Sequence, residues 1–265
     1  MNDALRLEIF ESGLLPWVLI FVMAVMLEVG WWVGKHCHLK LNQTRPDSTE
    51  AIVGSIFGLL ALLVAFTFSG ASDRFDRHRQ LIQSEMSAIS TAYSTVDLLK
   101  AEDQAVLRKA FIEYLDHRIV LYKKPLEFKE LSARFDKQAE LGNTIWLEAI
   151  RAVNSMNAFD REVSKLMLPK VLDMLDAYDN QRLSMRFHPP PIIWLSLFTL
   201  AIIGALVAGY NMGMEQKRDW VLTMVFVALM AGAIFVILNL EYPRVGSISL
   251  IEFEQEIVEL RNAIK

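Results

Sequence analysis

The sequence predicts an all-α membrane protein with four transmembrane helices and a water-facing helical bundle between the second and the third. Three observations lead to this fold class. The chain has 265 residues, of which 53% are hydrophobic and 22% charged, whereas a soluble domain is about 45–50% apolar. The apolar excess lies in four runs, and the charges lie between them. No strand pattern of convincing length occurs.

Each apolar run is long enough for a helix that crosses the hydrocarbon core, which takes about 20 residues. Tryptophans flank the first run, as expected at the two membrane interfaces. None of the runs contains Lys or Arg, and Glu28 is the one acidic residue within them. The four predicted spans are Leu14–Gly34, Ala51–Gly70, Pro191–Tyr210 and Trp220–Leu240.

Between residues 71 and 188 the apolar residues recur at the spacing of an amphipathic helix. No Pro or Gly follows Gly70 before residue 96, which predicts that the second span continues into this domain as one long helix. A break is expected at residues 100–103, followed by helices that end near 124, run from 127 to 154, and start near 159. Pro169 either kinks the last helix or marks its true start. The first helix carries the series Phe75, Ile82, Met86, Ile89, Tyr93 and Val96.

These elements divide the chain into three predicted segments. Residues 1–70 hold the first two spans, residues 71–188 form the water-facing domain, and residues 189–265 hold the last two spans and a C-terminal helix. Four spans place both termini and the domain on one face of the membrane. Lys and Arg near the spans favour neither face, so the positive-inside rule does not give the orientation.

The sequence gives no reason to expect an enzyme, a cofactor or a nucleic-acid partner. The net charge is −4, whereas nucleic-acid binding needs a clustered basic surface. Nucleophile-elbow, zinc-protease, phosphate-loop and dinucleotide motifs are absent. His36-Cys37-His38 and the acidic face of Asp173, Asp176 and Asp179 are better explained as ordinary surface residues than as metal ligands.

Small residues line one face of the second span, because Gly54, Gly58, Ala61, Ala65 and Ser69 recur every three or four positions. Small faces let helices approach closely in lipid. Two interpretations remain open. This face packs inside the chain against the first or third span, or copies of this helix surround an axis in an oligomer.

Bulky residues of the same span are candidates for a constriction. Phe57 and Phe68 are eleven positions apart and point within about 20° of each other on a straight helix, whereas Phe57 and Phe66 point about 180° apart. With Ala61 and Val64, Phe57 and Phe68 would line an apolar path, and hydrophobic constrictions can gate by dewetting.

Two acidic residues lie at or near membrane depth. An intramembrane acid such as Glu28 is a functional-site hypothesis by default. Because Trp31 is less than one turn away, Glu28 could instead reach the headgroups or pair with Lys35. At the end of the fourth span we expect Glu241 to pair locally with Arg244.

Several segments resemble a known family. They are the run Leu63–Ala71, the basic stretch Arg74–Arg79 that follows it, Glu85, Ala88-Ile89, Thr91-Ala92-Tyr93, His188-Pro189-Pro190 and Leu240–Gly246. Together they resemble the bacterial bestrophin-like domain family, most of whose members are uncharacterised. The resemblance runs from about Lys35 to the C-terminus. True bestrophins are oligomeric anion channels with four membrane-spanning helical units and a cytosolic helical domain. Their acidic calcium-binding segment has no clear counterpart here.

The resemblance implies an oligomeric channel or transport path in the lipid bilayer, with the helical domain as a vestibule or gating module. It places the protein in a bacterial inner membrane and the domain in the cytoplasm. The permeant ion is not identified by the sequence. The alternative is a non-conducting membrane scaffold or stress-sensing protein, which needs no axial path lined by the same helix from every subunit.

Overall fold

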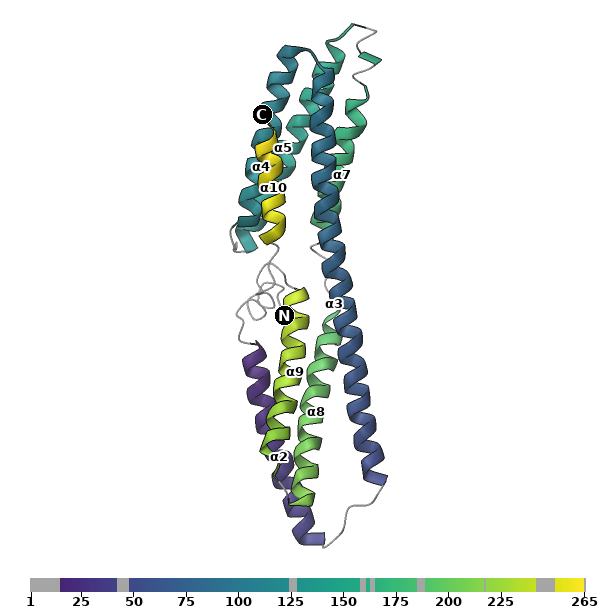
Figure 1. Cartoon of the computed structure of the whole chain (residues 1–265), viewed down its shortest axis with the longest axis vertical. Coiled ribbons are helices and arrows are strands. Elements are labelled where there is room, and N and C mark those ends of the chain that lie inside the picture. Colours follow the sequence, from purple (N-terminus) through teal and green to yellow (C-terminus); the bar gives the residue numbers. More distant parts are fainter. Residues whose placement is uncertain are drawn as a thin grey trace. The chain divides into compact units, whose positions relative to one another are not determined.

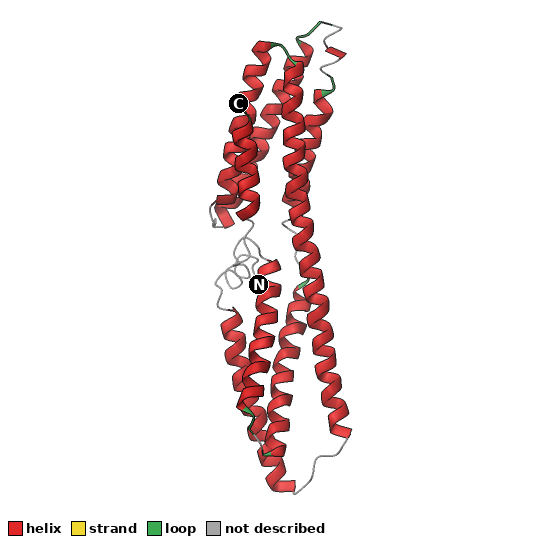
Figure 2. Ribbon diagram, viewed as in Figure 1, coloured by secondary structure: helices red, strands yellow, loops and turns green. Residues whose placement is uncertain are grey.

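The computed structural model describes residues 15–41, 48–123, 128–157, 161–162, 165–184, 189–216, 218–241 and 251–264. These residues form helices and connecting loops, with no strand among them, so the all-α prediction is confirmed (Figure 2). The elements, labelled in Figure 1, are α2 (Leu15–Leu41), α3 (Ser48–Ser94), the 3-10 helix η1 (Thr95–Leu98), α4 (Ala101–Lys123), α5 (Phe128–Asn154), α7 (Met167–Ser184), α8 (Pro191–Glu215), α9 (Trp220–Glu241) and α10 (Ile251–Ala263).

Four of these helices are long and apolar enough to cross a membrane, and they coincide with the four predicted spans. They are α2, α3, α8 and α9. α8 begins with Pro191. The N–H of a residue at the first helical position has no partner within the helix, so proline loses no hydrogen bond there. It ends at Gln216, whose φ of 53° is left-handed and whose N–H bonds the carbonyl of Gly213.

The chain forms two compact units. The membrane unit comprises residues 1–74 and 188–248, and the bundle unit comprises residues 75–187 and 249–265. α3 contributes to both, because it is a single helix from Ser48 to Ser94. The prediction that the second span continues past Gly70 as one long helix is therefore confirmed. α10 belongs to the bundle unit, whereas the sequence grouped it with the last two spans.

In the membrane unit, α2 and α8 pack through glycines at close range. A Cβ placed on Gly30 would lie 2.1 Å from the carbonyl oxygen of Leu206, and one on Gly209 would lie 2.1 Å from that of Leu27. Gly34 and Gly213 extend the contact by one turn. The two backbones therefore approach to a distance that any side chain larger than hydrogen would prevent.

The bundle unit surrounds a core that all its helices share. Ile89 of α3, Phe111 of α4, Ile145 of α5, Val171 of α7 and Ile257 of α10 are each fully buried in it. α7 starts at Met167, two residues before Pro169, so the proline lies in the first turn and marks the true start of the helix.

Candidate functional site

The apolar part of α3 is nearly unburied within the chain. In the most apolar 18 residues of α3, only 6% of the residues are buried, against 28% in the corresponding stretch of α2, 33% in α8 and 28% in α9. Leu60 is the buried exception, and it packs beside Gly204 of α8. Most of the apolar surface of α3 is therefore available to lipid or to another protein chain.

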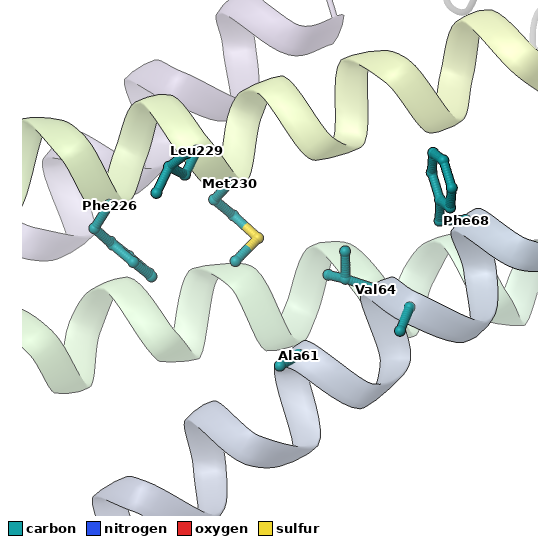
Figure 3. A pocket seen from close by; sticks show the side chains of 7 residues that line it. Ala61, Val64, Phe68, Phe226, Leu229 and Met230 are labelled. Atoms are coloured by element: carbon teal, nitrogen blue, oxygen red, sulfur yellow. The ribbon is translucent and has the colours of Figure 1, made fainter.

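An open apolar groove of about 440 Å³ separates α3 from α9. Figure 3 shows its lining side chains extending from the two helices toward each other. α9 contributes Phe226, Leu229 and Met230, and α3 contributes Ala61, Val64, Ala65 and Phe68. Three of the four residues predicted to form a constriction thus share one surface, and that surface carries no charged side chain.

Phe57, the fourth predicted constriction residue, packs inside the chain. Its ring meets that of Phe226 edge to face, with the centroids 5.6 Å apart at an interplanar angle of 88°. Phe66 is 68% exposed and is not among the groove residues. Phe68 is 45% exposed and lines the groove, so it is less engaged in internal packing than Phe57.

The small face of α3 makes no glycine contact inside the described part of the chain. A Cβ added to Gly54 or to Gly58 would meet nothing within 4 Å. Ala65 and Ser69 of this face are exposed as well. The interpretation that these glycines pack against the first or third span is therefore wrong. The close backbone contact through paired glycines lies between α2 and α8, and the sequence pattern did not distinguish it from the glycines of α3.

Glu28 pairs with a residue from the loop before α9. Its carboxylate lies 2.6 Å from Nη2 of Arg218, and its side chain is 55% exposed. The Arg218 guanidinium stacks 3.7 Å from the ring centre of Trp31 and 5.1 Å from that of Trp220. The alternative pairing with Lys35 is not observed, and Lys35 lies over the Trp31 ring instead. This cluster of aromatic and charged groups is typical of a membrane interface.

Glu241 links α9 to α3 across the membrane unit. Nε and Nη2 of Arg74 both lie 2.8 Å from its Oε2 atom, and the Glu241 side chain is 2% exposed. Arg244, the partner that we expected from the sequence, lies outside the described residues. Because Glu241 and Arg74 are 167 positions apart, local spacing could not reveal the pair.

The described ranges contain several His, Cys, Asp and Glu side chains. No group of three or more His, Cys, Asp or Glu side chains there is arranged to hold a metal ion. His36 bonds the carbonyl of Trp32 and Asp173 pairs with Lys170, so both belong to local surface structure.

These observations define a class of protein: an all-α membrane protein in which one apolar helix stays exposed because the rest of the chain does not cover it. The chain belongs to the bestrophin-like family, because the model of the bestrophin-like domain matches residues 20–251. No curated protein matches the chain.

Solved structures show the same fold. A variant of a bacterial bestrophin homologue from Klebsiella pneumoniae superposes with a TM-score of 0.64 at 11% identity, covering 92% of this chain and 98% of that one. A second variant gives 0.59 at 13% identity, with 92% and 99% covered. A structure described as a membrane protein gives 0.61 at 13% identity, with 92% and 98% covered.

Proposed function

We propose that this protein forms a homo-oligomeric ion channel or transport path, in which α3 of every subunit lines a common axis. The observation that carries the proposal is the exposure of the apolar part of α3. Membership of the bestrophin-like family supports it, since true bestrophins are oligomeric channels.

The chemistry of the exposed face favours another protein chain over lipid as its main neighbour. Helix association in membranes depends on van der Waals packing, which small residues improve by letting backbones approach. Gly54 and Gly58 offer such a surface and have no neighbour inside the chain. A second copy of α3 is the partner that is available to every subunit.

The path itself would be apolar in its narrow part. Ala61, Val64 and Phe68 provide no charge and no metal ligand, so the constriction would act through its width and wetting.

The bundle unit would stand in water as a vestibule or gating domain. Its surface carries ion pairs with well-exposed partners, among them Lys109 with Glu113 and Lys137 with Glu140. Such pairs contribute little to stability and are typical of a solvated surface. We place this unit in the cytoplasm of a bacterium and the membrane unit in its inner membrane, as the family resemblance implies.

The proposal is tested by measuring ion flux across the membrane of liposomes that contain the purified protein. Phe68→Ala should raise the basal flux, because a wider and wetter constriction lowers the barrier to ion entry. Phe57→Ala should raise it less, because the Phe57 ring packs against Phe226 inside the chain, and it should also cost some stability. Phe66→Ala is the matched control, since it makes the same change outside the groove.

The rival function makes the opposite forecast for the same samples. A scaffold or stress-sensing protein gives no flux in the parent or in any of the three variants. That result, with folded and correctly inserted protein, would reject the channel. Equal increases for Phe66→Ala and Phe68→Ala would instead reject the assignment of the constriction to the groove face.

A further inference from the structure

Two basic side chains from different elements meet at one indole ring of the membrane unit. The guanidinium of Arg218, in the loop before α9, lies 3.7 Å from the centre of the Trp31 ring. The ammonium of Lys35, on α2, lies 4.9 Å from the same ring centre. The π-electrons of an indole attract cations in this position. We refer to Trp31, Lys35 and Arg218 as the cationic cluster, and all three belong to the membrane unit.

The packing of α2 against α8 brings the two cations together. A Cβ on Gly213 of α8 would lie 2.8 Å from the backbone nitrogen of Lys35, so the end of α8 passes directly beside this residue. α8 ends at Gln216, whose left-handed φ of 53° turns the chain. Arg218 follows two residues later and reaches the Trp31 ring. The positions of both cations therefore follow from the helix contact.

The charges of the cluster do not balance. The Glu28 carboxylate lies 2.6 Å from Nη2 of Arg218. Among the described residues, no carboxylate forms an ion pair with Lys35. With two cations and one acid, the site keeps a net positive charge. Its Trp31 indole also holds a buried Nε1 donor that has no acceptor in the described part of the chain. Buried donors are normally hydrogen-bonded, so these groups indicate an anionic acceptor from outside the chain.

The depth of the cluster in the membrane favours one source for that acceptor. The rings of Trp32 and Trp220 are 58% and 55% exposed, and exposed tryptophans at the ends of spans lie at the level of the lipid headgroups. Lys35 is four residues beyond Trp31, which is about 6 Å along the helix axis. Lipid phosphates are the anions present at this level, and Arg and Lys form strong charge-assisted hydrogen bonds with phosphate.

We propose that the cationic cluster binds the phosphate of an anionic phospholipid headgroup. Lys35 and Arg218 supply the positive charge and the donors. Trp31 orients both cations, and Glu28 holds Arg218 in place while lowering the charge of the site. This binding site goes beyond the proposed function, because it does not depend on whether the protein conducts.

The experiment uses the single cysteine of the chain as a local reporter. Cys37 is two residues after Lys35 and takes a fluorophore. The full-length protein is reconstituted in phosphatidylcholine vesicles with increasing fractions of phosphatidylglycerol whose acyl chains carry bromine, which quenches the fluorophore on contact. We expect half-maximal quenching at a lower fraction of brominated phosphatidylglycerol than of brominated phosphatidylcholine. Equal fractions for the two lipids would overturn the proposal.

The variants test which charges produce this preference. Lys35→Gln should need about fivefold more phosphatidylglycerol for half-maximal quenching, since one basic residue near a membrane surface contributes about that factor. Lys35→Arg should keep the parent value. The matched control is Lys109→Gln, which removes the same charge from a side chain that is 78% exposed on the bundle unit, and it should also keep the parent value.

Glu28→Gln separates a phosphate site from a purely structural ion pair. In a phosphate site, removing the acid raises the positive charge, so less phosphatidylglycerol should suffice for quenching. If Glu28 and Arg218 only fasten the loop to α2, the variant brings no such gain. No gain in Glu28→Gln, or no loss in Lys35→Gln, would therefore overturn the proposal.

A competition arm distinguishes a lipid headgroup from free phosphate. Inorganic phosphate is added on both sides of the vesicle membrane, with sodium chloride of equal ionic strength as the reference, because salt alone screens charges. We expect the two salts to leave the same preference for phosphatidylglycerol. If inorganic phosphate abolishes the preference and sodium chloride does not, the site takes free phosphate and the assignment to a lipid is wrong.

Discussion

The glycine contact between α2 and α8 allows a sharp test of the membrane unit. In Gly209→Ala, the new Cβ would lie 2.1 Å from the carbonyl oxygen of Leu27 and 2.8 Å from its carbonyl carbon. Both groups are backbone, so no side-chain rotation can relieve the clash. Real Cβ atoms keep at least 3.0 Å, so the helices must separate here by the difference, about 0.9 Å.

The expected cost follows from that separation. A gap of about 0.5–1 Å removes a quarter to a half of the attraction energy of each van der Waals contact. Overpacking of this kind costs about 1–3 kcal/mol, and the better helix propensity of alanine returns up to about 1 kcal/mol. We expect Gly209→Ala to lose about 1–2 kcal/mol of stability on balance.

Thermal unfolding in detergent is the assay, with Gly232→Ala as the matched control. Gly232 lies within α9, and a Cβ there meets nothing within 4 Å. Gly209→Ala should therefore unfold at a lower temperature than the parent, and Gly232→Ala should not. If Gly209→Ala unfolds at the parent temperature, α2 and α8 do not pack through this glycine and the reasoning fails.

Three further predictions concern the membrane unit. Arg74→Met removes the guanidinium from the buried Glu241 carboxylate and should cost about 1–3 kcal/mol in unfolding measurements, with recovery when Glu241→Met is added; no recovery would exclude the pair as the cause. Gly58→Leu should reduce the mass of the oligomer by light scattering while leaving the subunit folded, because that position is open within the chain; an unchanged mass would remove this face from the assembly surface. With the bundle unit in the cytoplasm, Cys37 should react with a membrane-impermeant thiol reagent on intact cells. If Cys37 reacts only after lysis, it faces the cytoplasm and the proposed topology is wrong.

Periodicity along single helices predicted much of the fold. The absence of Pro and Gly after Gly70 predicted that the second span continues as one helix, and α3 does run unbroken to Ser94. The spacing of Phe57 and Phe68 placed them on one side of that helix, apart from Phe66. Such inferences succeed because they need only the helical repeat of about 3.6 residues.

Pairings between distant helices could not be predicted in the same way. Glu28 meets Arg218 across 190 positions, and Glu85 meets Arg118 across 33. A single sequence shows that such charges exist, but their partners depend on how helices pack. Lys35, the local partner considered for Glu28, is therefore not the partner observed.

The glycine spacing shows a different limit. The G-x-x-x-G pattern occurs at Gly54 and Gly58, at Gly30 and Gly34, and again at Gly209 and Gly213. A Cβ on either glycine of the first pair would meet nothing within 4 Å, whereas the other two pairs form the α2–α8 contact. The same spacing suits contacts within a chain and contacts between copies, so only the packed structure distinguishes them.

The central claim is that α3 of every subunit surrounds a common axis. Particle imaging of the protein purified in detergent tests this claim most directly, because it locates α3 in the assembly without knowledge of the permeant ion. We predict a closed ring in which the α3 helices are the innermost membrane helices and Phe68 faces a continuous central path. A monomer, or a ring whose α3 helices lie on the outer rim, would contradict it.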